Sequence, residues 1–263
     1  MEPIVTRVGF ADFGDYDHFG KRLYRDIAGR TSFLGLAVFA ISGTLLPAED
    51  VAVIDDVAVC MHCPEPRVWP AKLGRIAASA GHFPVGIVVG WSALDSEIGV
   101  HLGDEAAHML LDLQRELDAG TDAPAIMAAF VKGRATLPGF GVHGRRVDER
   151  VEALRACLVR RGRSEGKFWK LAEALWPVAQ AERSLDPSIW AAVAAVLLDL
   201  GLEPGQMGPL LSLLFQPSYL AHAVEGAKLK SPSLRRLPPE AVRYLGKEPR
   251  TSPRALEAEK QRR

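Results

Sequence analysis

Apolar residues recur at helical spacing along most of this chain, and that periodicity constrains the fold more than any other feature. Between positions 104 and 117, the apolar residues on one side of a helix are Ala107, Leu110, Leu111, Leu113 and Leu117. Strict alternation of apolar and polar residues, the pattern of a half-buried strand, is absent almost everywhere. The sequence therefore predicts a mainly α-helical protein.

The same periodicity, together with residues that start and stop helices, predicts the other elements. Helices are expected over 31–42, from 47 towards 63, and over 71–81, 85–91, 124–132, 151–158, 168–178, 188–200 and 207–225. Residues 1–30 mix aromatic with charged side chains, and we expect an irregular lead-in there. The polar stretch 249–263 is expected to be a mobile tail.

The predictions of two of these helices depend on particular residues. For 31–42, Thr31 or Ser32 is a candidate N-cap and Gly43 a candidate stop. The run 85–91 is β-like in composition. We interpret it as a helix packed through Gly86 and Gly90, although glycine and β-branched residues each disfavour helix modestly.

Composition and charge narrow the class of protein. With 263 residues, 48% of them hydrophobic and 24% charged, the chain can bury a full core. Lys plus Arg equals Asp plus Glu at 32 each, so no overall field favours nucleic acid or an anionic membrane. No apolar run approaches the ~18 residues that span a bilayer, and the N-terminus lacks a signal-peptide pattern. We expect a cytoplasmic protein with no nucleic-acid and no membrane partner.

The three cysteines do not predict a metal or redox site. Cys60 and Cys63 are the close pair, and Cys157 is distant in sequence. A structural zinc site needs a second ligand pair at similar spacing, and a thioredoxin-like motif needs a βα junction rather than helical flanks. Buried structural thiols are the interpretation that these residues favour.

The loop 137–150 is the stretch that indicates chemistry. It combines glycines, one histidine and arginines: Gly139, Gly141, Gly144, His143, Arg145, Arg146 and Arg150. Glycines let backbone N–H groups approach a ligand, guanidinium forks match carboxylate or phosphate, and an imidazole can transfer a proton near neutral pH. The residues are compatible with an anion-binding loop and with a solvated turn between two helices.

The three glycines also match Gly-x-Gly-x-x-Gly, the dinucleotide-binding fingerprint. That fingerprint needs a strand before it and a helix that starts at the third glycine. The preceding residues 131–138 contain a glycine, two cations and a proline where a buried strand would be apolar. The context therefore disfavours a dinucleotide site.

The loop resembles a segment of a known enzyme family. Gly139-Phe-Gly-Val-His-Gly-Arg-Arg-Val-Asp-Glu-Arg150 is similar to the Gly-Phe-Gly-His-Arg … Asp-Pro-Arg segment of the citrate synthase and citryl-CoA lyase superfamily, with Val142 interposed and Glu149 in place of proline. Other segments resemble the family in the same order: 71–81 with 87–90 and His101-Leu-Gly-Asp-Glu-Ala-Ala107, Arg183-Ser-Leu-Asp186, Tyr219-Leu-Ala-His-Ala-Val-Glu225, and Arg236-Leu-Pro-Pro … Tyr244-Leu-Gly246.

The resemblance implies a citrate synthase-like helical fold with two domains. The large helical domain comprises 1–100 and 201–248, a smaller inserted helical domain comprises 101–200, and 249–263 is the tail. The family's site lies near a subunit interface, which implies a homodimer. The implied reaction makes or cleaves a carbon–carbon bond next to an acyl-CoA thioester, from citryl-CoA-like substrates or from acetyl-CoA and a 2-oxo acid. Coenzyme A is then a substrate, and neither a tightly bound cofactor nor a metal is expected.

The resemblance also implies roles for individual residues. Such chemistry needs a base for the α-proton, a donor to the enolate oxygen and an acid for the acceptor carbonyl. The matched residues are Asp186 as base, His101 as enolate stabiliser and His143 as acid. Arg150 and Arg236 would hold acceptor carboxylates. The positions matched to the coenzyme A site are Gly139, Phe140, Gly141, Gly144, Arg145 and Arg146.

Some of these residues have simpler readings. Asp186 precedes Pro187 and Ser188 ahead of an apolar helix, which is the signature of an N-cap followed by proline at the first helical position. A cap and a base are compatible roles. His222, on a helix rich in alanine and leucine, is interpreted as a core or interface histidine.

Two departures from the family bear on the acceptor acid. An arginine that binds a substrate carboxylate in the family is replaced by Phe215, seven residues before His222, and a family histidine is replaced by Glu65. We therefore expect a less cationic pocket that takes an acid with fewer carboxylates than citrate. The alternative is a catalytically silent helical protein with a binding or regulatory role, which Phe215, Glu65 and Val142 favour.

Overall fold

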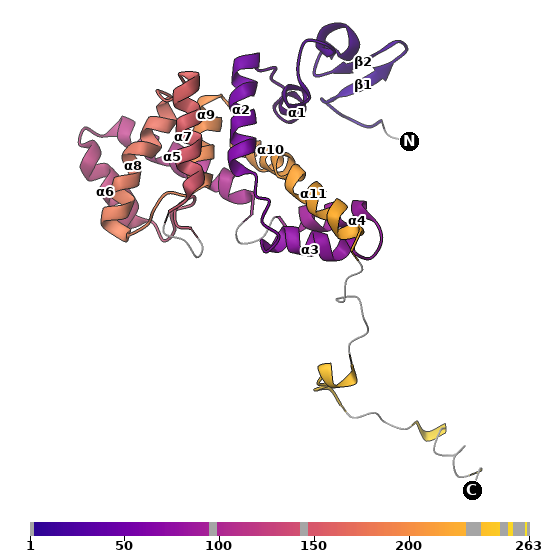
Figure 1. Ribbon diagram of the computed structural model, residues 1–263. Helices are drawn as coiled ribbons and strands as arrows, with labels where there is room; N and C mark the ends of the chain where they lie inside the picture. Colours follow the sequence, from indigo (N-terminus) through magenta and orange to yellow (C-terminus); the bar gives the residue numbers. More distant parts are fainter. Residues whose placement is uncertain are drawn as a thin grey trace. The chain divides into compact units, whose positions relative to one another are not determined.

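The computed structural model describes residues 3–94, 99–142, 147–229, 238–247, 252–254 and 261. The chain divides into two compact units, Met1–Lys230 and Ser231–Arg263. Within the described residues, the first unit contains all eleven α-helices, and the second contains the 3-10 helix Pro239–Ala241 (Figure 1). The prediction of a mainly α-helical protein is confirmed.

The eleven helices follow the predicted order closely. They are α1 Phe33–Ser42, α2 Ala48–Met61, α3 Trp69–Ala78, α4 Phe83–Ser92, α5 His101–Ala119, α6 Ala123–Gly133, α7 Glu149–Arg161, α8 Lys167–Arg183, α9 Ile189–Asp199, α10 Met207–Leu214 and α11 Gln216–Ala227. The limits of α1 confirm the predicted signals. Ser32 Oγ accepts the N–H of Gly35 at 3.1 Å, and Gly43 ends the helix with φ 73°.

The first thirty residues are not the irregular lead-in that the sequence predicts. They contain a three-stranded antiparallel sheet in the order β1 Gly9–Asp12, β2 Asp15–His18, β3 Lys21–Arg22, followed by a π-helical turn. Strands of two to four residues are too short to give a readable alternation. The turns use Gly14 and Gly20, which have φ values of 97° and 76°.

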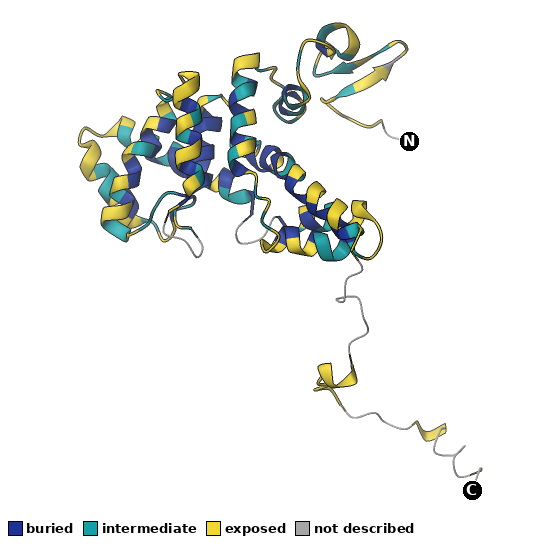
Figure 2. Cartoon of the chain, viewed as in Figure 1, coloured by how far each residue is buried: buried dark blue, intermediate teal, exposed yellow. Residues whose placement is uncertain are grey.

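Helix α9 is the centre of the hydrophobic core. Ten of its eleven residues are apolar, and all but Trp190 and Asp199 are buried. It packs against α5, α7 and α8, and Figure 2 shows buried residues concentrated on these helices. Burial on every side explains why the sequence of α9 is apolar all round rather than amphipathic.

Helices α3, α4 and α11 form a second packed group held together by glycines. A Cβ on Gly86 of α4 would lie 2.6 Å from the carbonyl oxygen of Gly74 on α3, and one on Gly226 of α11 would lie 2.6 Å from that of Arg75. Gly90 likewise approaches the ring of Tyr219. The interpretation of 85–91 as a helix packed through Gly86 and Gly90 is confirmed, because both glycines lie in close contact with neighbouring helices.

The predicted single helix over 207–225 is two helices, which corrects the sequence prediction. Helix α10 ends at Leu214 and α11 begins at Gln216, with Phe215 between them. Pro217 lies in the first turn of α11. Proline cannot donate a backbone hydrogen bond to the preceding turn, so the chain restarts a helix there. None of the helices in the described part of the chain has the length and apolar character needed to cross a membrane.

Candidate active site

The glycine loop is joined to the backbone around Asp186. The N–H of Gly141 donates to the carbonyl oxygen of Asp186 at 2.7 Å, and the N–H of Ser188 donates to the carbonyl oxygen of Gly139 at 2.9 Å. Phe140 and Pro187 form the antiparallel bridge between these two bonds. Two segments that the sequence selects independently, 139–141 and 186–188, are therefore paired side by side.

Position 139 requires glycine because the loop packs closely against α9 there. Its φ is +82°, and a Cβ at this position would lie 2.6 Å from the backbone nitrogen of Ala191 in the first turn of α9. No side chain fits there without moving one of the two backbones. Gly141 also has a positive φ of +80°, but a Cβ there would meet only Leu185, at 3.6 Å.

Arg183 fixes the entrance of the loop. Its Nη1 donates to the carbonyl oxygen of Arg134 at 2.8 Å and its Nη2 to that of Ala135 at 3.1 Å. Arg183 is the last residue of α8, and Ser184 after it adopts φ 54°. The segment 183–188 therefore binds the loop at two successive places.

Asp148 fixes the exit of the loop, and no motif in the sequence predicts a role for its side chain. Its carboxylate accepts Arg150 Nε and Nη2, both at 2.7 Å, and the backbone N–H of Ile189 at 2.8 Å. Burial alone would raise the pKa of Asp148, but the hydrogen bonds and charge of Arg150 and the Ile189 N–H outweigh burial and lower it. Asp148 is also the N-cap of α7. An aspartate directly before a helix with apolar periodicity is therefore the sequence signal that could have identified this residue.

Asp186 is half-buried and does not cap α9, so the cap interpretation is wrong. The helix begins at Ile189, and its N-cap is Ser188. Pro187 is not its first residue, because Pro187 pairs with Phe140 in the extended bridge. The Asp186 carboxylate is thus free of the helix-capping role that its sequence position suggested.

His101 begins α5, which packs against both α9 and α10. One turn later, Asp104 accepts the N–H of Gly205 at 2.7 Å and that of Gly208 at 3.2 Å. These bonds hold the start of α10 against the start of α5. The enolate-stabilising role of His101 stays a prediction.

Phe215 lies in a row of three aromatic rings. Its centroid is 6.0 Å from that of Trp190 on α9 and 6.4 Å from that of Tyr219 on α11, onto which it stacks with an interplanar angle of 23°. Phe215 is 7% exposed. Phe215 is therefore packed against α9, the helix that follows Asp186.

Several predicted site residues lie outside the described residues. They are His143, Gly144, Arg145, Arg146 and Arg236. Of the others, the structure brings together Gly139, Phe140, Gly141, Asp186 and Arg150, the last through Asp148 and Ile189.

The segment after α2 contacts α11 through polar groups. Ser218 Oγ lies 2.9 Å from Nδ1 of His62, and His222 Nε2 donates to the carbonyl oxygen of Pro64 at 2.9 Å. His222 is therefore a buried, hydrogen-bonded histidine, as interpreted from the sequence. Glu65 binds Arg67 in a two-bonded pair, and this hydrogen bonding lowers the pKa of Glu65 to about 2.

The cysteines are free and half-buried rather than fully buried. Burial, and next the neighbouring Cys157 thiol, raise the pKa of Cys60 to about 12. The structure therefore places Cys60 beside Cys157 of α7.

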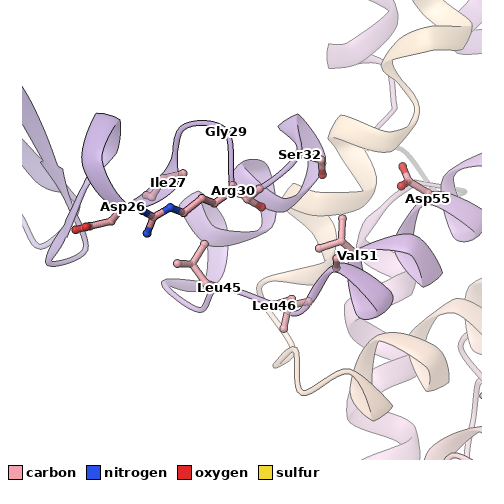
Figure 3. A pocket seen from close by; sticks show the side chains of 11 residues that line it. Asp26, Ile27, Gly29, Arg30, Ser32, Leu45, Leu46, Val51 and Asp55 are labelled. Carbon is pink, nitrogen blue, oxygen red and sulfur yellow. The ribbon is translucent and has the colours of Figure 1, made fainter.

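A cavity of about 530 Å³ lies among the residues before α1 and the start of α2 (Figure 3). Arg30, Asp26 and Asp55 supply its charges, and Ile27, Leu45, Leu46 and Val51 its apolar wall. None of the predicted site residues that the structure describes lines it. The cavity is therefore separate from the loop that meets Asp186.

The arrangement of helices is that of the citrate synthase-like fold. The structure matches citryl-CoA lyase from Hydrogenobacter thermophilus with a TM-score of 0.77 and 21% identity, over 97% of this chain and 100% of that one. It matches ATP citrate lyase from Methanothrix soehngenii, solved with citrate and coenzyme A, at TM-score 0.71 and 18% identity, over 94% of this chain and 43% of that one.

A citrate synthase is similar as well. The enzyme from Thermoplasma acidophilum, in a ternary complex with carboxymethyl coenzyme A and oxaloacetate, matches at TM-score 0.60 and 15% identity, over 84% of this chain and 58% of that one. No protein-family model and no curated protein matches the sequence. At these identities the likeness establishes the fold, and the chain spans about half the length of ATP citrate lyase and citrate synthase.

Proposed function

We propose that the protein is an enzyme that makes or cleaves a carbon–carbon bond next to an acyl-CoA thioester. The observation that carries this proposal is the backbone pairing of Gly141 with Asp186, which joins the loop leading to His143 with the proposed base. The fold supports it, because the similar structures are named citryl-CoA lyase, ATP citrate lyase and citrate synthase.

In this proposal Asp186 removes or returns the proton at the carbon next to the thioester carbonyl. His101 donates a hydrogen bond to the enolate oxygen, and His143 protonates or polarises the carbonyl of the acceptor acid. Asp186 suits the role of base because its carboxylate is half-buried and is not used to cap α9.

Substrate groups are assigned to the arginines and to the loop. Arg150 and Arg236 bind acceptor carboxylates, since a guanidinium pairs with a carboxylate through two hydrogen bonds. The coenzyme A nucleotide is assigned to Gly139, Phe140, Gly141, Gly144, Arg145 and Arg146. Gly139 is buried against Ala191, and Gly141 is exposed with its N–H bound to the carbonyl oxygen of Asp186.

The acceptor is an acid with fewer carboxylates than citrate, such as a 2-oxo acid with an apolar tail. Phe215 supplies no charge, and with Trp190 and Tyr219 it presents aromatic rings where the family has an arginine. An unpaired carboxylate in such surroundings costs several kcal/mol. An alkyl chain can pack there instead.

We further propose a homodimer in which α4 packs against a second copy. Gly86 and Gly90 of α4 face α3 and α11, so its large apolar residues face outwards: Phe83, Val85, Val88 and Trp91 are 47 to 59% exposed. Contiguous exposed apolar patches of this kind mark protein interfaces. In light scattering Val88→Lys should give a monomer, whereas Val59→Lys, at a 75% exposed position on α2, should leave the dimer intact.

The proposed domains are those that the family resemblance implies. The large domain comprises 1–100 and 201–248, the small domain comprises 101–200, and 249–263 is a tail, of which the structure describes 252–254 and 261. The location proposed with this function is the cytoplasm.

A catalytically silent binding protein of the same fold is the second candidate. The buried ring of Phe215 and the pairing of Glu65 with Arg67 favour it, because Phe215 stands where the family has a substrate-binding arginine and Glu65 where the family has a histidine. One experiment separates the two functions. Purified protein is incubated with acetyl-CoA and a panel of 2-oxo acids, and separately with citryl-CoA, while free thiol and acetyl-CoA are measured. Turnover that Asp186→Asn abolishes supports the enzyme, and binding of coenzyme A without turnover supports the silent protein.

A further inference from the structure

Asp148 is the one described carboxylate that contacts both the proposed acceptor arginine and the helix after Asp186. Its side chain has no exposed area. Oδ1 accepts Arg150 Nε at 2.7 Å and the Arg150 backbone N–H at 3.2 Å. Oδ2 accepts Arg150 Nη2 at 2.7 Å and the Ile189 N–H at 2.8 Å. Both oxygens therefore have two donors each.

Asp148, and not the N-cap residue of α9, binds the first N–H group of that helix. Ser188 occupies the N-cap position, but its hydroxyl donates to Gly139 and makes no capping bond. The first N–H of α9 is bound by Asp148 instead. A buried negative charge at this place also interacts favourably with the positive end of the helix dipole.

The same contacts determine which part of Arg150 can meet a substrate. Asp148 occupies Nε and Nη2, which are the two donors of one side of the guanidinium fork. Within the described residues Nη1 has no acceptor, so it is proposed to bind the substrate, and the Arg150 side chain is 28% exposed. The buried Asp148 carboxylate fixes the direction of Nη1, because the planar guanidinium group cannot rotate while both of its bonds to Asp148 are kept.

We infer that Asp148 is a positioning residue that holds Arg150 in place for the acceptor acid and, through Ile189, holds the start of α9 in register with Asp186. This inference rests on the proposed function for its kinetic consequence, but its structural half does not depend on turnover. Arg150 acts on substrate binding and Asp186 on chemistry, so loss of Asp148 disturbs both.

The test compares Asp148→Asn with Arg150→Gln, which keeps the Asp148 bond to Ile189. Arg150→Gln should raise KM for 2-oxobutyrate about ten-fold or more with little change in kcat, as expected when only substrate binding is lost. Asp148→Asn should raise KM by a similar factor and also lower kcat about ten-fold. The double variant should be no worse than Asp148→Asn, because the two residues act as one unit.

The matched control is Asp199→Asn. Asp199 caps α8 through the N–H groups of Phe168 and Trp169, at 2.8 and 2.9 Å, and has no part in the proposed site. It should leave KM and kcat at their wild-type values. If Asp148→Asn changes only the melting temperature, as Asp199→Asn should, the positioning role is wrong. Asp148→Glu, which keeps the charge, should recover part of kcat and replaces the Asn variant if that variant does not fold.

Hydrogen exchange tests the structural half even if the wild type turns over no substrate. The amides of 139–142 and 189–192 should exchange at least about ten-fold faster in Asp148→Asn and at the wild-type rate in Asp199→Asn. Unchanged exchange at these amides overturns the inference. If exchange is faster in Asp148→Asn but the wild type is inactive, the structural role of Asp148 stands and the proposed reaction is rejected.

Discussion

The hydroxyl of Ser188 donates to the carbonyl oxygen of Gly139 across 2.8 Å, and the Ser188 backbone N–H donates to the same oxygen at 2.9 Å. A single serine thus binds the glycine loop with both its side chain and its backbone. The bond lies in the buried part of the molecule, where a lost partner is not replaced by water.

We expect Ser188→Ala to lower the free energy of unfolding by about 1 kcal/mol, the usual value of one buried hydrogen bond. Ser212→Ala is the control, because Ser212 Oγ donates to Gly208 at 2.8 Å within α10 and does not bind the loop. Denaturant unfolding should give a smaller loss for Ser212→Ala, because its bond is only part-buried and alanine favours the helix. Only Ser188→Ala should raise hydrogen exchange at Gly141, and equal exchange in the two variants would contradict a specific link to the loop.

Gly139→Ala should destabilise the protein more than a positive φ alone explains. The new methyl group would lie 2.6 Å from the Ala191 nitrogen, so the loop or α9 must move. Gly201→Ala is the matched control, since Gly201 has φ +81° and no atom within 4 Å of the added carbon. Left-handed backbone costs about 1–2 kcal/mol for a non-glycine residue, and Gly139→Ala should exceed that by at least about 1 kcal/mol. Equal losses would mean that the contact relaxes freely.

The stabilising effect of Asp148 should depend on pH in a definite direction. Its pKa in the folded protein is lowered, so its contribution is present above ~4, the value for unfolded aspartate, and is lost as the pH falls through the folded pKa. The difference in unfolding free energy between wild type and Asp148→Asn should therefore shrink from about pH 6 to about pH 3. A difference that grows on acidification would contradict the charged, Arg150-bound state.

Helices could be predicted from this sequence because their periodicity is local. The positions of Ser32 and Gly43 fixed the limits of α1, and the glycines of 85–91 indicated a close helix contact. The break at Phe215 was missed because 207–225 keeps its apolar period across Pro217. The N-terminal sheet was missed because its strands are shorter than one readable alternation.

The candidate site depends on contacts between residues far apart in the sequence, which local patterns do not predict. Sequence selected Gly139, Gly141 and Asp186 from separate motifs, and the structure pairs their backbones. It did not select Asp148, whose role depends on Ile189, 41 residues away. A contact of that kind leaves no periodic signal. The sequence also could not show that the N-cap of α9 is Ser188 and not Asp186, because Pro187 is compatible with either position.

Asp186→Asn should abolish turnover without a comparable loss of stability. The carboxylate does not cap α9, so we expect the unfolding free energy to stay within about 0.5 kcal/mol of wild type, as for most substitutions away from buried networks. Removing the proposed base should lower kcat by about 10² to 10⁴. Denaturant unfolding and steady-state assays of one preparation check both values. A large loss of stability with proportionate loss of activity would assign Asp186 a structural role only.

Phe215→Arg should change the preferred acceptor acid. The guanidinium would stand between Trp190 and Tyr219, on whose rings it can stack, and would supply a positive charge for a further carboxylate of the acceptor. Affinity for oxaloacetate or citrate should rise by about ten-fold or more, which corresponds to the ~1.5 to 3 kcal/mol of a charge-assisted hydrogen bond. Phe215→Gln is the neutral control and should lose the apolar packing without that gain. Calorimetric titration of both variants with oxaloacetate and with 2-oxobutyrate gives the comparison. If the wild type already binds oxaloacetate tightly and the arginine adds nothing, another cation fills the role, and Phe215 does not determine the acceptor.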